Sequence, residues 1–85
     1  IKDIDLFEIH EAFASTIILA QRQLGIPEDK LNVNGGCIAL SHPMGATGSI
    51  MLSSLIDEME RQDLSIGIVA TSGAAGAGTA LLIQR

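Results

Sequence analysis

The stretch LSIGIVATSGAAGAGTALLIQR, residues 64–85, decides the fold at the end of this chain. Two runs of aliphatic and β-branched residues, 64–71 and 78–85, flank the small-residue segment SGAAGA. Such runs favour strands, and a short glycine-containing connection between two of them is typical of a hairpin. The pattern therefore predicts an antiparallel strand pair, with Ser72 at the end of its first strand.

A helix is predicted upstream of this hairpin. Pro43 fits its first turn, where a missing N–H loses no helical partner, and Ser41 or His42 is suited to cap it. Gly45 and Gly48 each lower helix propensity by about 1 kcal/mol relative to alanine, so we expect a group to approach the backbone closely there. The rest of the helix carries an apolar face, formed by Ile50, Leu52, Leu55, Ile56 and Met59.

The first 25 residues predict a strand followed by an amphipathic helix. The segment DLFEIH, residues 5–10, is typical of a short strand that carries His10 to its end. Glu11 and Ala12 would open the helix, and Gly25 would stop it. One stripe of this helix is apolar, with Phe13, Ile17, Ala20 and Leu24 at helical spacing.

Residues 31–45 link the two predicted helices and are rich in glycine and asparagine, which is typical of a shaped loop. Within it, CIAL (37–40) is suited to a short buried strand. The predicted order is therefore strand, helix, loop, helix, strand, strand. This order indicates one α/β domain over residues 1–85, with a mixed β-sheet and flanking helices.

The composition indicates that part of the surface meets a partner. Hydrophobic residues make up 47% of the chain and charged residues 18%, and the mean hydropathy is +0.39. This is more apolar than a small independent domain usually is. The chain begins at Ile1 rather than at methionine, so we expect a piece of a longer polypeptide whose N-terminal neighbour is missing. Another chain could cover the apolar surface in place of this neighbour, and we expect a homo-oligomer.

Charge and cysteine content exclude several classes of function. The net charge is −5, with no basic cluster to neutralise phosphates, so we expect no nucleic-acid partner. The longest aliphatic run, residues 80–83, is far too short to cross a bilayer, so we expect no membrane partner. The single cysteine, Cys37, excludes an internal disulfide and is too little for a thiolate metal site, so we expect no metal. It is compatible with a reducing compartment, and we expect the cytoplasm.

Three polar residues stand where functional groups are commonly displayed. His10 lies at a strand-to-helix corner, His42 at a predicted helix start and Ser72 at a strand end. From the residues alone, a histidine at a helix start is more often a cap than a catalyst. The motifs around these residues change that weighting.

Three segments resemble the C-terminal half-domain of thiolases, the acyl-CoA C-acyltransferases. They are HEAFA (10–14), NVNGGCIALSHPMGATGS (32–49) and the terminal hairpin that closes in ALLIQR, and they match in order and spacing. The middle block is the most specific, because it is long. HEAF resembles a variant of the commoner NEAF. The resemblance covers nearly the whole chain and implies part of a five-stranded mixed sheet, with one helix covering it and the other buried against the missing domain.

The resemblance implies roles for both histidines. His42, in SHP, would activate a nucleophilic cysteine and donate a hydrogen bond to the thioester oxygen. His10 would hold a water that completes the same oxyanion site. The nucleophile itself belongs to the N-terminal half. The substrate would be a coenzyme A thioester, with no resident cofactor.

The resemblance also implies contacts to the substrate. Phe13 corresponds to an aromatic residue that lines the acyl pocket, and the NGG loop, from Asn34 and Gly35 to Gly36, packs beneath the site. Met44, in the same block as His42, is expected to bind substrate. Cys37 falls at a position that is usually small, so we interpret it as a packing residue.

Ser72 departs from the family pattern. It takes the place of a second cysteine, the acid and base that acts on the α-carbon of the second acyl-CoA. An alcohol is a far weaker acid than a thiol, whose ordinary pKa is about 8.5. The backbone N–H of Ala74 would join a second oxyanion hole. Ser41 replaces the glycine before the histidine, which is a smaller departure.

Two functions remain open at this stage. The first is the C-terminal part of a thiolase-like acyltransferase, which acts by thioester transfer and by Claisen condensation or thiolysis. The second is a thiolase-derived domain that binds acyl-CoA or another subunit and lacks full activity because of Ser72. A dinucleotide-binding loop at GAAGAG is disfavoured, because a strand rather than a helix follows the glycines.

Overall fold

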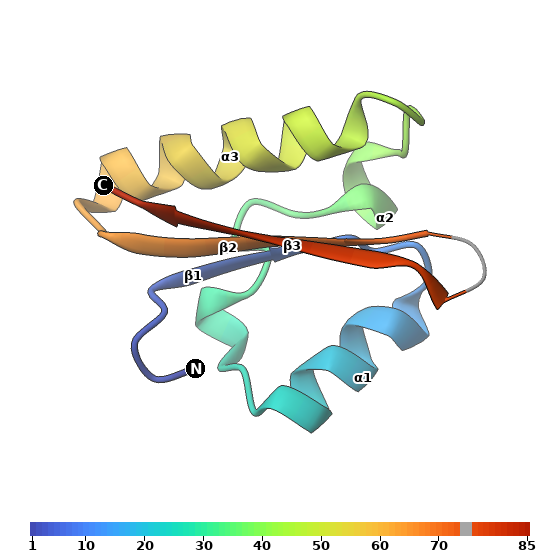
Figure 1. Ribbon diagram of the computed structural model, residues 1–85, viewed down its shortest axis with the longest axis horizontal. Coiled ribbons are helices and arrows are strands. Elements are labelled where there is room, and N and C mark those ends of the chain that lie inside the picture. Colours follow the sequence, from blue (N-terminus) through green and yellow to red (C-terminus); the bar gives the residue numbers. More distant parts are fainter. Residues whose placement is uncertain (74–75) are drawn as a thin grey trace.

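The computed structural model describes residues 1–73 and 76–85, and its elements follow the predicted order (Figure 1). The two additions are short helical turns between the two predicted helices. The elements are β1 (Leu6–Ile9), α1 (Ala14–Leu24), a 3₁₀ turn (Glu28–Lys30), α2 (Cys37–Leu40), α3 (Thr47–Gln62), β2 (Ile66–Ser72) and β3 (Gly78–Gln84).

The described strands form one mixed sheet in the order β1-β2-β3. β1 runs parallel to β2, with Leu6 opposite Gly67, and β2 pairs antiparallel with β3, with Ser72 opposite Gly78. The predicted terminal hairpin and the α/β class with a mixed sheet are confirmed. The described residues supply three strands of the five that the resemblance implied.

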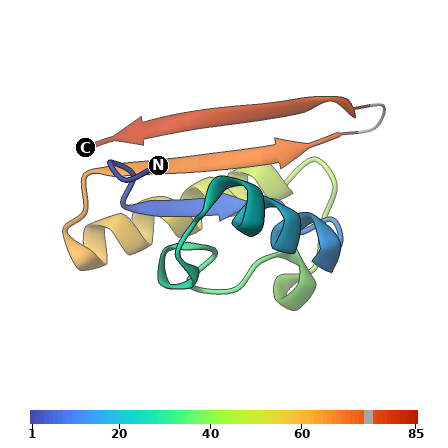
Figure 2. The ribbon, with the colours of Figure 1, turned by 90° about the horizontal axis from the view of Figure 1, so that it is seen from below.

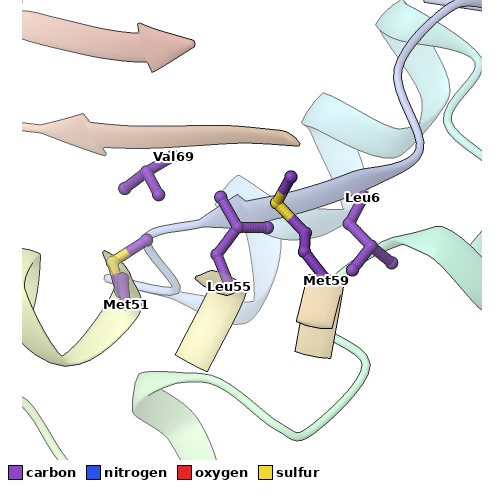
Figure 3. Packing of buried hydrophobic residues seen from close by; sticks show 5 residues of the cluster. All are labelled: Leu6, Met51, Leu55, Met59 and Val69. Atoms are coloured by element: carbon purple, nitrogen blue, oxygen red, sulfur yellow. The ribbon is translucent and has the colours of Figure 1, made fainter. Parts of the chain in front are cut away.

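The core lies between the sheet and α3, which covers one face (Figure 1). The cluster joins α3 to β1 and β2 through Leu6, Met51, Leu55, Met59 and Val69, whose side chains converge in Figure 3. Gly67 makes this packing possible, because a Cβ there would lie 2.8 Å from the sulfur of Met59. The absence of a side chain on β2 thus lets α3 sit directly on the sheet.

The buried face of α3 differs from the predicted one. Met51, Leu55 and Met59 recur every fourth residue and form a single buried row. Ile50 is 41% exposed, so it lies outside that row. Leu55 and Met59 were correctly predicted to be buried, while Met51 was missed.

The start of α3 was also predicted too early. Gly45 has a φ of 92°, which a helix does not accommodate, so a turn follows Pro43 and the helix begins at Thr47. Ala46 is the N-cap residue, and no side chain caps the helix, so neither Ser41 nor His42 has that role. Apart from each glycine's own chain neighbours and helix backbone, no described atom would lie within 4 Å of a Cβ at Gly45 or Gly48, so the expected close approach is not made within the described chain.

α1 lies on the face of the sheet opposite α3 (Figures 1 and 2). It begins at Ala14 rather than at Glu11, because Phe13 is in an extended conformation, and it ends at Gly25 as predicted. It contains no buried residue. The resemblance implied that one helix covers the sheet and the other is buried against the missing domain, and of these two α1 is the helix without buried residues.

CIAL forms the helical turn α2 rather than a buried strand. The carbonyl of Gly36 accepts hydrogen bonds from the backbone N–H groups of Ala39 and Leu40, which closes the turn. None of its four residues is buried. A run of four apolar residues is too short for its pattern to distinguish a strand from a helical turn.

Large apolar side chains remain exposed on several elements. They include Ile18 and Leu19 on α1, Ile38 and Leu40 on α2, and Leu81 and Leu82 on β3. Among the described residues, no helix is both long enough and apolar enough to span a membrane.

Candidate active site

Two histidines that are far apart in the sequence meet at one end of the sheet. His10 follows β1, and its backbone N–H donates to the carbonyl of Ala70, which continues the pairing with β2. His42 lies in the loop between α2 and α3. The ring centroids are 4.6 Å apart, and the planes are tilted by 44°. The pairing that the motifs implied is therefore present.

Asn32 holds the end of β1 in place immediately before His10. Its side-chain Oδ1 accepts from the N–H of Ile9 at 2.8 Å, and its Nδ2 donates to the carbonyl of Ile9 at 2.9 Å. The backbone N–H of Asn32 also donates to the carbonyl of Phe7. The φ of Asn32 is 46°, a conformation that asparagine tolerates better than most residues. Sequence reasoning missed Asn32, although its place at the start of the NVNGG motif was a signal.

Thr47 determines which nitrogen of His42 carries the proton. The Thr47 Oγ1 lies 2.6 Å from Nδ1 of His42, and it donates its own hydrogen to the carbonyl of Pro43. With its hydrogen in that bond, Oγ1 accepts from Nδ1–H of His42. Nε2 is then left with a free lone pair, which is the form needed for a general base. Thr47 is buried, and the sequence analysis did not single it out.

His10 is buried without hydrogen-bond partners for its ring. The residue is 7% exposed, and neither ring nitrogen meets a partner among the described residues. A buried polar atom without a partner costs about 1–3 kcal/mol. The ring is therefore available to a group that comes from outside the described chain.

Ser72 lies with the two histidines around one cavity. The cavity measures about 300 Å³, and its lining residues are His10, His42, Met44, Gly45, Thr47, Gly48, Thr71 and Ser72. Met44 is 88% exposed at its rim. Ala74, to which the sequence analysis gave an oxyanion-hole role, lies outside the described residues.

The other expected substrate contacts are not part of this cavity. Phe13 is 71% exposed next to α1. Asn34 donates from Nδ2 to Glu58 on α3 at 2.9 Å, which ties its loop to that helix. Gly35 lines a second cavity of about 20 Å³. The structure thus groups Met44 with the histidines and gives Asn34 an additional structural contact.

Cys37 lies beside the histidine pair. Its Sγ and one ring nitrogen from each of His10 and His42 all lie within 4.8 Å of one another. The side chain is half-buried at the start of α2. Its interpretation as a packing residue missed this placement, because no sequence spacing relates Cys37 to His10.

Residues 1–85 match the family model for the C-terminal domain of thiolase. The chain belongs to the thiolase family. It is 51% identical over 80 residues to a 3-ketoacyl-CoA thiolase of Bacillus subtilis, with 94% of this chain and 20% of the relative covered. It is 45% identical over 83 residues to an acetyl-CoA acetyltransferase of Synechocystis sp., with 98% of this chain and 21% of the relative covered.

Solved thiolase structures share the fold of this chain. The crystal structure of the Bacillus anthracis acetyl-CoA acetyltransferase superposes with a TM-score of 0.95 at 40% identity. Human mitochondrial 3-ketoacyl-CoA thiolase gives the same TM-score at 39% identity. Each match covers 99% of this chain and 21% of the solved chain. The chain therefore spans about one fifth of the length of these thiolases.

This chain has serine at position 41, where the resemblance to thiolases implies glycine, and the backbone there favours glycine. Ser41 has a φ of 72° and a ψ of 173°, a combination that is almost confined to glycine and costs other residues about 1–3 kcal/mol. We expect Ser41→Gly to raise the free energy of unfolding by about 1 kcal/mol, because the entropy of glycine in the unfolded chain offsets part of the gain. Urea denaturation measures this change, and a loss of stability would contradict the strained geometry.

Glu8 is a buried carboxyl two residues before His10, on the same face of β1. Burial, with a smaller contribution from the charge of Glu11, raises the pKa of Glu8 to about 7. The carboxyl borders the same small cavity as Gly35. Glu8 thus keeps its proton in the folded state at pH values where an unfolded chain has lost it.

This raised pKa predicts a stability that falls as pH rises. Between the ordinary pKa of 4.5 and about 7, the folded state binds the extra proton, so the free energy of unfolding decreases across that window by about 3 kcal/mol. Glu8→Gln should remove this pH dependence. The free energy of unfolding of the variant should therefore rise relative to that of the unsubstituted chain as the pH increases from 4.5 to 7. Urea denaturation across this range measures the difference, with Glu60→Gln, an exposed site on α3, as the control. Parallel profiles for the chain and Glu8→Gln would contradict the assignment.

Proposed function

We propose that this chain supplies the histidine side of an acyl-CoA C-acyltransferase active site. The nucleophilic thiol would come from polypeptide outside these 85 residues. The observation that carries the proposal is the histidine pair. The ring centroids of His42 and His10 lie 4.6 Å apart, and the ring of His10 has no partner among the described residues. The hydrogen bond to Thr47 leaves Nε2 of His42 as a free base.

The first half of the reaction follows from this arrangement. Nε2 of His42 removes the proton of the nucleophilic thiol, and the sulfur attacks the carbonyl carbon of the acyl-CoA. The resulting oxyanion accepts hydrogen bonds from the imidazolium of His42 and from a water held by His10. Collapse of the tetrahedral species expels coenzyme A, which leaves as the thiol with the proton from His42.

The second half of the reaction depends on Ser72. Condensation needs a base that removes an α-proton from the second acyl-CoA, and thiolysis needs an acid that protonates the departing carbanion. The position of Ser72 at the end of β2, on the cavity shared with the histidines, supports this assignment. A hydroxyl performs either step poorly. We therefore expect acyl transfer to be retained and carbon–carbon chemistry to be slow.

The second candidate function is an acyl-CoA-binding or subunit-interaction domain without full activity. Ser72 favours it, and so do the exposed apolar side chains of α1 and β3. For either function, we propose that these surfaces are covered by the N-terminal part of the thiolase or by another subunit of a homo-oligomer. We also propose a cytoplasmic location, supported by the single free cysteine, Cys37.

A chimera tests the proposed function directly. The matching stretch of the Bacillus subtilis 3-ketoacyl-CoA thiolase is replaced by this chain, and the product is incubated with a short acyl-CoA, quenched with acid and analysed by mass spectrometry. We expect one acyl group on the nucleophilic cysteine of the relative. The 85-residue chain alone should carry none, because it lacks that cysteine.

Two results would contradict this proposal. A folded chimera without an acyl adduct would favour the binding function. A stable acyl group on Cys37 of the isolated chain would show that the nucleophile has been misplaced.

A further inference from the structure

We propose that His10, Cys37 and His42 form a binding site for one zinc-like divalent cation. One ring nitrogen from each histidine and Sγ of Cys37 lie within 4.8 Å of one another. Two imidazoles and one thiolate, with a fourth position left for water, are a donor set that Zn²⁺ favours. The sequence argued against a metal because it contains one cysteine, but the fold adds two histidines from other segments.

The buried ring of His10 is the second observation that points to a ligand. His10 is 7% exposed, and both ring nitrogens lack a partner among the described residues. A cation bound to one of these nitrogens would satisfy it and would fix the proton on the other. The water that the proposed function places on His10 and a cation would be alternative partners for this ring.

His42 has the hydrogen bonding of a metal ligand. A ligating histidine usually donates its second ring N–H to a fixed acceptor, which orients the ring and raises its basicity. Thr47 Oγ1 is that acceptor here, since it receives Nδ1–H and is itself bonded to the carbonyl of Pro43. Nε2 is left as the donor atom for a cation.

The three donors need only a small rearrangement to bind an ion. Ligand atoms of a tetrahedral zinc site lie about 3.3–3.6 Å apart. From separations of up to 4.8 Å, the required approach is on the order of 1 Å. Cys37 stands at the start of the short α2 and His42 in the irregular segment after it, so side-chain rotation and loop adjustment supply this movement.

Binding of the cation exchanges one proton for one metal–sulfur bond and involves no redox step. A bond forms between the cation and Sγ as the thiol of Cys37 releases its proton to water, and the two imidazoles bind in their neutral forms. The carboxylate of Glu11 lies against Gly36, the residue before Cys37, and its negative charge favours a cation there. Mg²⁺ and Ca²⁺ prefer oxygen ligands and should bind weakly.

An occupied site would block acyl transfer. The cation takes the lone pair of Nε2 that His42 needs as a base, so it would act as a reversible inhibitor. This consequence rests on the proposed function, whereas the binding itself does not.

The experiment uses the full 85-residue chain, whose only thiol is Cys37. The chain is titrated with Zn²⁺ in metal-free buffer, and the rate of Cys37 alkylation by iodoacetamide is measured at each step. We expect saturation at one ion per chain and a fall of at least tenfold in the alkylation rate. With Co²⁺ as a spectroscopic probe, we expect a sulfur-to-metal charge-transfer band that is absent in Cys37→Ser.

Variants separate this site from general binding at acidic surfaces. His10→Asn removes one donor and Thr47→Val removes the support of another, and each should weaken Zn²⁺ binding by about 10–100-fold or more. Asp57→Asn, an exposed change on α3, should have no effect. Far-UV circular dichroism verifies the fold of each variant.

Unchanged alkylation of the unsubstituted chain at saturating Zn²⁺ would overturn the site, and this measurement needs no variant to fold. Equal Zn²⁺ affinity in a folded Cys37→Ser would overturn it as well. If the chimera forms its acyl-enzyme but the chain binds no Zn²⁺, the metal site is refuted and the proposed function stands.

Discussion

Replacing His42 with alanine in the chimera is expected to lower kcat/KM for acyl transfer by about 10²–10⁴-fold. The substitution removes the one nitrogen that Thr47 leaves as a free base, and it also removes a hydrogen-bond donor to the oxyanion. Because both contributions act before coenzyme A leaves, the loss should appear in the rate of acyl-enzyme formation. Rapid quench followed by mass spectrometry measures that rate.

Thr47→Val provides the matched control for this prediction. Valine preserves the shape of the buried side chain and removes the oxygen that accepts from Nδ1 of His42. The imidazole stays, but its proton is no longer confined to Nδ1, so we expect a smaller loss than for His42→Ala. A rate for His42→Ala within threefold of the unsubstituted chimera would exclude His42 as the base.

Local patterns predicted β1, β2 and β3 correctly, because each of these strands is recorded in its own residues, whereas CIAL was wrongly expected to be a strand. The aliphatic runs on both sides of Gly73 define the hairpin that the structure shows, and Gly25 has the left-handed conformation that ends α1. The start of α3 was missed for a different reason. Pro43 is compatible with both a helical first turn and the preceding turn, and only the φ of Gly45 decides between them.

In the candidate site, some residues were found from motifs, and others could be found only in the folded structure. The motifs brought His10, His42 and Ser72 to attention, and the structure places all three around one cavity. Asn32 and Thr47 escaped notice because their roles are hydrogen bonds made in the folded chain. The contact from Asn32 to Ile9 spans 23 positions, and no periodicity records such a distance.

Phe13 and Cys37 show why a motif alone does not place side chains in space. Phe13 belongs to the recognisable HEAF segment, yet it is exposed on the described chain. Cys37 is at an unremarkable position in its motif, yet the turn of α2 carries its sulfur to both histidines. Partner surfaces and turn geometry decide these placements, and neither can be seen in a local pattern.

Ser72→Cys in the chimera is expected to raise thiolytic or condensing turnover by about 10²–10⁴-fold. Ser72 already lines the cavity that contains His10 and His42, so a thiol there needs no new position. A thiol exchanges its proton near neutral pH far more readily than a hydroxyl does. Only the α-proton step uses this group, so the rate of acyl-enzyme formation should change little.

The rate of turnover and the rate of acyl-enzyme formation together distinguish the two candidate functions. Ser53→Cys, an exposed serine on α3, introduces a thiol away from the cavity and should give no gain in turnover. A gain confined to Ser72→Cys would show that the site retains the shape for carbon–carbon chemistry and lacks only a sufficiently acidic group. If acyl-enzyme forms at the normal rate and Ser72→Cys adds nothing, the cavity no longer positions a second acyl-CoA. The second candidate function, a domain without full activity, would then be favoured, because an acyl-enzyme without a carbon nucleophile can pass its acyl group only to water or back to coenzyme A.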